Sequence, residues 1–204
     1  MLTLTDSGTD TQFARVAGVA LLITVLTLVL LFAIRSAPAG VHAPPHALVL
    51  WKIEALAYLA MTVSGIALAR SLPLTGAALA TGGALNVVQL GIGLTMFRPL
   101  LDGGPGLEPM FKPVWMAAFF FFFAGKAALG LAGLSYGRAL WSKGTGMAHW
   151  LGGVAALTGL VGMVLGAAGM VTGQVLIWQV GAVGTLAALF LGLALLVAPP
   201  RAEA

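Results

Sequence analysis

Six apolar runs without an interior proline constrain the fold of this chain more than any other feature. Each run exceeds the about 20 residues that an α-helix needs to cross a hydrocarbon core about 30 Å thick. All ten prolines lie outside the runs or at their edges, and a proline inside a helix would break its hydrogen-bond ladder. The sequence therefore predicts an all-α polytopic integral membrane protein, a single bundle of six transmembrane helices. The runs are Phe13–Ile34, Ala47–Ala69, Leu74–Phe97, Val114–Tyr136, Met147–Met170 and Gln174–Val197.

Composition excludes a water-soluble fold. Of the 204 residues 60% are apolar and 8% are charged, against about 45–50% and about 25% in soluble domains. Membrane strands are disfavoured, because they would be about 10 residues long with alternating polarity. The chain has no cysteine, which removes disulfides, thiolate metal sites and cysteine catalysis.

The connections between the runs predict how neighbouring helices pair. Segments 70–73 and 171–173 are short, so the second and third helices, and the fifth and sixth, are expected to be antiparallel neighbours. Two connections are longer, residues 35–46 and residues 98–113, and the second is the longest extramembrane loop of the prediction. Its four prolines and mixed charges fit either an ordered cap over one mouth of the bundle or a simple surface connector.

The basic residues lie mostly at the ends of the runs, where they suit lipid headgroups. The predicted partner is thus the lipid bilayer, and no clustered basic patch suggests nucleic acid. Five basic residues fall on the side of the termini against four on the other, which favours cytoplasmic termini in an inner or plasma membrane. The terminal set is Arg15, Arg70, Arg138, Lys143 and Arg201, and the opposite set is Arg35, Lys52, Arg98 and Lys112. Ala37-Pro38-Ala39 resembles a signal cleavage site, but the preceding run is too long for a signal core of 7–15 residues.

Lys126 is the only charged residue in the fourth run. A lysine at the centre of a spanning helix costs about 2.5–3.5 kcal/mol or more, so a compensating partner is expected. Glu54 is the only acid inside another run, and the two differ in depth by roughly 7–8 Å, which a lysine stem can largely bridge. A Glu54–Lys126 pair would act either as a proton relay or solute-binding charge, or as a structural ion pair. The first alternative predicts that Lys126→Met folds and is inactive.

Amides and a phenol extend this candidate site. Asn86 and Gln89 lie three residues apart on one glycine-lined face of the third run, and Tyr58 follows Glu54 by four residues in the second. Such groups line a polar path or join helices by hydrogen bonds. The predicted site therefore comprises Glu54, Lys126, Asn86, Gln89 and Tyr58, between the second, third and fourth helices.

Glycines dominate the last two runs. In the fifth run they recur every three or four residues, and in the sixth they are accompanied by an alanine, a pattern that lets helix backbones approach closely in lipid. We expect the fifth and sixth helices to form a tight hairpin, with oligomer contact as the alternative. The seams are Gly159, Gly162, Gly166, Gly169 and Gly173, and Gly181, Gly184, Ala188 and Gly192.

The sequence shows no residue pattern that is typical of a metal, haem or catalytic site. His42, His46 and His149 all lie outside the middle of a run, so no metal or haem is predicted. Usual catalytic motifs are missing, and no catalytic residue or cofactor is assigned. The block Phe119–Phe123 fits lipid-facing surface, with a site for a carotenoid, quinone or sterol as the alternative.

The first functional hypothesis is a small transporter or channel for a solute or ion, with its path along the second, third and fourth helices. The second is a non-catalytic accessory subunit of a homo-oligomer or a larger membrane complex. A cofactor-binding or enzymatic role comes third. A hydrated cavity touching Glu54, Asn86 and Lys126 would favour transport, whereas a packed interior would favour the subunit.

Overall fold

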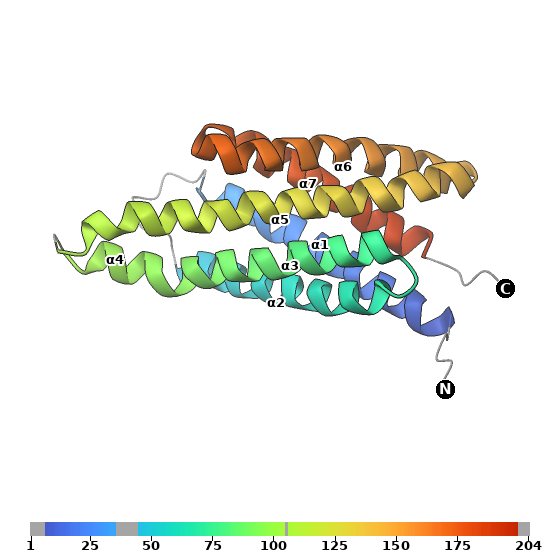
Figure 1. Cartoon of the computed structure of the whole chain (residues 1–204). Coiled ribbons are helices and arrows are strands. Elements are labelled where there is room, and N and C mark those ends of the chain that lie inside the picture. Colours follow the sequence, from blue (N-terminus) through green and yellow to red (C-terminus); the bar gives the residue numbers. More distant parts are fainter. Residues whose placement is uncertain (1–6, 36–44, 105, 200–204) are drawn as a thin grey trace.

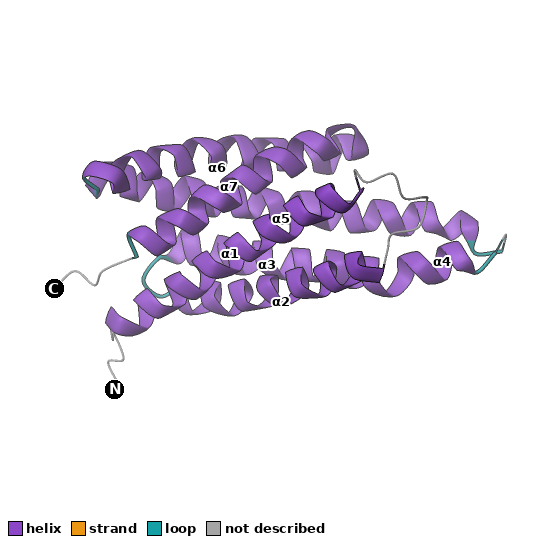
Figure 2. Ribbon diagram, turned by 180° about the vertical axis from the view of Figure 1, so that it is seen from behind, coloured by secondary structure: helices purple, strands orange, loops and turns teal. Residues whose placement is uncertain are grey.

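The computed structural model describes residues 7–35, 45–104 and 106–199, and their regular structure is entirely helical (Figure 2). The all-α prediction is confirmed. The long helices are α1 (Ser7–Arg35), α2 (Pro45–Leu68), α3 (Pro73–Ile92), α5 (Glu108–Lys143), α6 (Gly146–Thr172) and α7 (Ile177–Val197). A π-helical turn (Gly93–Phe97) joins α3 to the short α4 (Arg98–Asp102), and a 3-10 turn (Gly173–Leu176) joins α6 to α7.

Five helical segments are long and apolar enough to cross a membrane, which makes the chain a helical membrane protein in contact with lipid. They are Gly8–Ala33, Leu48–Leu68, Pro73–Asp102, Glu108–Lys143 and Gly146–Val197. The last segment contains both α6 and α7, because the 3-10 turn continues the helical chain between them.

Among the described residues, five of the six long helices form a closed ring, and the remaining long helix lies outside it. Going round, α1 packs on α2, α2 on α3, α3 on α5, α5 on α7, and α7 on α1 again. Helix α6 covers α5 and α7 from outside (Figure 1). Within the described chain, α2 and α5 do not pack directly on each other, so any contact between them crosses the middle of the ring.

The segment 98–113, predicted as a loop, is helical over residues 98–102 and 108–113. Helix α3, the π-helical turn and α4 run on as one 30-residue segment, and α5 already begins at Glu108. Pro109 lies in the first turn of α5, where a proline costs no intrahelical hydrogen bond, and Pro99 lies in α4 just after the π-helical turn. Pro113 lies inside α5, so the prediction that every proline lies outside the helices or at their edges is wrong there.

Helices α6 and α7 pack on each other, as their short connection predicts, but the glycine seam of α6, which was expected to face α7, packs mainly on α5. A Cβ added at Gly159 would lie 2.4 Å from the backbone nitrogen of Leu134 and 2.6 Å from the carbonyl oxygen of Gly130. Gly162 alone approaches α7, at an ordinary 3.5 Å from the Cβ of Ala187. Gly192 of α7 in turn faces Gly18 of α1. The tight antiparallel pair is therefore α5–α6.

The described chain begins and ends at the same end of the bundle (Figure 1). Residues 36–44, which hold His42 and the Ala37-Pro38-Ala39 sequence, lie outside the described residues. His46 falls in the first turn of α2.

Candidate functional site

Lys126 projects from α5 into the middle of the helix ring and is 4% exposed. Its aliphatic stem lies against Gly184 of α7, where an added Cβ would come within 2.9 Å of the lysine Cδ. A glycine at this position therefore makes room for the stem. The glycine pattern instead predicts that Gly184 packs against the preceding helix.

The ammonium group of Lys126 is held from two sides. It donates a hydrogen bond of 3.1 Å to the Tyr58 hydroxyl on α2. It also lies 5.4 Å from the ring centroid of Phe122, a distance at which an aromatic face attracts a cation. Lys126 thus connects α5 to α2 across the ring.

Glu54 completes the polar centre of the ring. It is buried one helical turn before Tyr58, and its carboxylate lies close enough to the Tyr58 hydroxyl and to Lys126 to interact with both. Thr24 of α1 also lies close to the Tyr58 hydroxyl and donates its own proton to the carbonyl oxygen of Leu21. We call Thr24, Glu54, Tyr58, Phe122 and Lys126 the lysine cluster.

The expected direct Glu54–Lys126 bridge is replaced by a connection through Tyr58. The one salt bridge within 4.0 Å among the described residues joins Arg98 and Asp102, at 3.1 Å on the surface. The cause lies in the difference of depth between Glu54 and Lys126. Tyr58, about 6 Å further along α2 than Glu54, fills that interval.

The two predicted amides lie apart from this chain of hydrogen bonds. Asn86 is buried, donates a 2.7 Å hydrogen bond to the carbonyl oxygen of Gly82 and packs against Gly125 of α5. Its Oδ1 atom has no hydrogen-bond partner. Gln89 is half-buried. Among the described residues, no hydrogen bond connects Asn86 or Gln89 with Lys126.

Three participants were missed from the sequence. Thr24, Phe122 and Gly184 come from α1, α5 and α7, so the polar centre involves two helices that the prediction left out. A threonine in the middle of an apolar run was a usable signal for Thr24. Nothing in the local sequence of Gly184 distinguishes it from the other glycines of α7.

Two grooves lie elsewhere on the bundle. One, of about 360 Å³, runs between α3 and α5 and includes Leu74, Leu131 and Arg138. The other, of about 450 Å³, runs between α1 and α2 and includes Arg15, Ile23 and Ile53. Neither includes a residue of the lysine cluster, Asn86 or Gln89.

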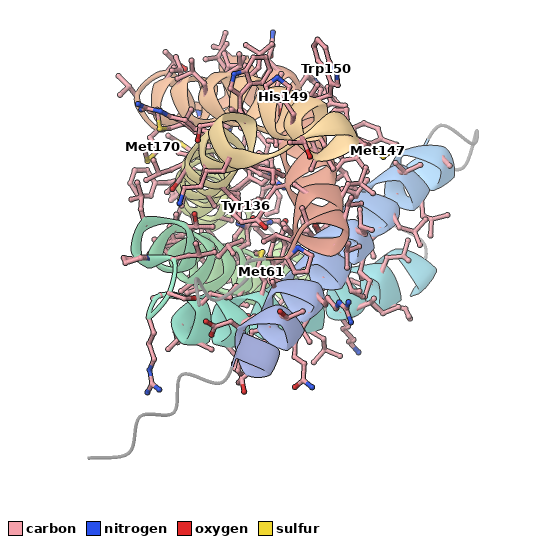
Figure 3. All side chains as sticks on the ribbon, turned by 90° about the vertical axis from the view of Figure 1, so that its right-hand side faces the viewer. Met61, Tyr136, Met147, His149, Trp150 and Met170 are labelled. Atoms are coloured by element: carbon pink, nitrogen blue, oxygen red, sulfur yellow. The ribbon has the colours of Figure 1, made fainter. Side chains whose placement is uncertain are left out.

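The end of the bundle that carries the termini has a separate aromatic group. His149 Nδ1 lies 2.7 Å from the carbonyl oxygen of Trp141, and the His149 and Trp141 ring centroids are 4.4 Å apart. Figure 3 shows His149 and Trp150 at the outer edge of the bundle, whereas Met61 and Tyr136 lie inside it. This placement fits an aromatic group at the membrane–water interface.

These contacts describe a charged centre that is enclosed by α1, α2, α5 and α7. The chain has no significant match to any protein-family model, curated protein sequence or solved structure, so its function is inferred from this geometry alone.

Proposed function

We propose that the protein is a non-catalytic accessory subunit of a larger membrane assembly. One observation carries the proposal: the hairpin of α3–α4 and α5 extends well past the ends of the other helices (Figure 1). Helix α5 has 36 residues and is about 54 Å long, against a hydrocarbon core of about 30 Å. The tip of the hairpin is therefore expected to stand in the headgroup region or in water.

The tip combines a stiff frame with exposed apolar side chains. The Arg98–Asp102 salt bridge lies within α4, and the rings of Phe97 and Phe111 pack edge to face at 5.5 Å between the two arms. Leu101 and Met110 are 59% and 53% exposed. Apolar groups gathered on a rigid surface outside the lipid are typical of protein contact sites.

In this proposal the chain crosses the membrane six times. Helices α6 and α7 have 27 and 21 residues, about 40 Å and about 31 Å, and pack on each other. They are joined through Gly173, whose φ of +67° favours glycine. Six crossings agree with the shared end of the termini in Figure 1, which we assign to the cytoplasmic side.

In this proposal the lysine cluster has a structural role, which is to join α2 to α5. Glu54 and Lys126 act as a charge pair connected through Tyr58, and this pair holds α2 and α5 at a fixed distance across the ring. Such a tie would keep the hairpin, whose second arm is α5, in a constant position for its partner.

A transport path through Glu54, Tyr58, Asn86, Gln89 and Lys126 is the second candidate. The unpartnered Oδ1 of buried Asn86 favours it, because a buried acceptor without a partner commonly binds water. Transport requires that the ring open far enough to admit water or a solute to Lys126.

The accessory-subunit proposal predicts that the variant Leu101→Glu with Met110→Glu loses its partner. Two carboxylates in an apolar contact cost about 3 kcal/mol or more, which weakens binding about a hundredfold or more. The measurement is purification from native membranes in mild detergent, followed by native mass spectrometry. We expect the wild type to carry a partner in near-stoichiometric amount; a partner of the chain's own mass identifies a homo-oligomer.

Val175→Glu is the matched control, since Val175 is 78% exposed in the turn between α6 and α7, outside the hairpin. It should keep the partner. A wild type that purifies alone, or a control that loses its partner as fully as the hairpin variant, contradicts the proposal.

A further inference from the structure

The groove between α3 and α5 grades from apolar to polar along its length. On α5, Leu131, Leu134, Arg138 and Ser142 follow one another at helical spacing along its wall. From Leu131 to Ser142 the helix rises about 16 Å, roughly half of a hydrocarbon core about 30 Å thick. The groove therefore covers the depth of one leaflet.

The polar end of the groove lies at headgroup level. Arg138 precedes Trp141 by three residues, and the rings of Trp141 and Trp150 pack 6.2 Å apart at this end of the bundle. Tryptophan concentrates at the membrane–water interface. Arg138 is exposed there and forms no salt bridge or side-chain hydrogen bond with any described residue.

The hydroxyl group of Ser135 lies between the apolar and the polar end of the groove. Ser135 accepts a 3.1 Å hydrogen bond from Thr75 of α3, so the Ser135 proton remains for another acceptor. No described residue accepts it. The ester carbonyl oxygen of a glycerolipid is an acceptor at this depth, just below the phosphate.

We propose that this groove binds one phospholipid with an anionic headgroup, in the leaflet that faces the chain termini. Arg138 binds the phosphate, Ser135 donates to an ester carbonyl, and Leu74, Leu131 and Leu134 contact an acyl chain. The assignment rests on charge complementarity together with the hydroxyl of Ser135, because a basic group and a hydroxyl above an apolar slot between helices suit the phosphate, ester and acyl chain of an anionic lipid. It is independent of the accessory-subunit proposal.

The test places purified protein in nanodiscs of phosphatidylglycerol and phosphatidylcholine with identical acyl chains, and counts retained lipid by native mass spectrometry. We expect the wild type to retain phosphatidylglycerol in preference to phosphatidylcholine. Arg138→Gln should reduce that preference about fivefold, the effect of one basic residue near an anionic surface. Leu134→Trp keeps the charge and fills the slot, and it should remove the retained lipid.

Arg15→Gln is the matched control. Arg15 stands in the other groove, between α1 and α2, whose remaining lining is apolar and has no hydroxyl. This variant should retain phosphatidylglycerol as the wild type does. Equal losses in Arg15→Gln and Arg138→Gln, retention in Leu134→Trp, or no preference in the wild type would each overturn the proposal.

Discussion

Gly159→Leu should remove most of the folded protein. The new side chain would meet the backbone nitrogen of Leu134 and the carbonyl oxygen of Gly130, and these main-chain atoms cannot turn aside as a side-chain tip can. Overpacking a close contact costs about 1–3 kcal/mol and occasionally more, and we expect at least the upper end here. Size-exclusion yield and melting temperature in detergent measure the effect.

Gly181→Leu provides the control on the neighbouring helix, since a Cβ at Gly181 meets no atom within 4 Å. It should fold like the wild type. Gly162→Leu should be less harmful than Gly159→Leu, because its Cβ has an ordinary 3.5 Å contact with Ala187. Equal yields from Gly159→Leu and Gly181→Leu would contradict the packing of α6 on α5.

Lys126→Met should lower the free energy of unfolding by about 3–5 kcal/mol, the usual cost of removing one partner of a buried charge pair. The substitution leaves Glu54 buried without a compensating cation and removes the hydrogen bond to Tyr58. Thermal unfolding in detergent, followed by tryptophan fluorescence, measures the loss. If Lys126 served only in transport, Lys126→Met would instead fold with the stability of the wild type.

Glu54→Gln added to Lys126→Met is the informative control. With both charges gone, no uncompensated ion remains, and replacing a whole buried pair is often neutral. The double variant should therefore regain much of the stability that the single variant loses. Additive losses would show that Glu54 and Lys126 are not coupled.

The helices could be predicted because their signal is local. Run length and the placement of proline are sufficient to recognise a spanning helix, and the predicted run Leu74–Phe97 lies within the helical segment Pro73–Asp102. The ends of the fourth helix were wrong because Pro109 and Pro113 looked like loop residues. Proline is tolerated in the first turn of a helix, where Pro109 lies, and α5 also continues through Pro113 in its interior.

The short connections predict that α2 neighbours α3 and that α6 neighbours α7, and both pairs pack, but the face of each helix that meets a neighbour could not be predicted in the same way. These helices are apolar on all sides, so sequence periodicity does not identify the face that meets a neighbour. Gly159 and Gly184 look alike in the sequence, yet the first contacts the backbone of α5 and the second the stem of Lys126. The candidate site was predicted in part, because the burial cost of Lys126 demanded a partner, while the intervening position of Tyr58 depends on the packing of the whole ring.

Access of water to the lysine cluster tests the account most directly. The chain has no cysteine, so Thr24→Cys introduces a single thiol beside Tyr58, at a position 4% exposed. The measurement is modification by a small water-soluble thiol reagent in native membranes, with Val175→Cys as the exposed reference. We expect Thr24→Cys to remain unmodified while Val175→Cys reacts fully, and to react only after denaturation. Reaction of both thiols at similar rates in native membranes would mean that water reaches Lys126, which contradicts a sealed structural tie and favours transport.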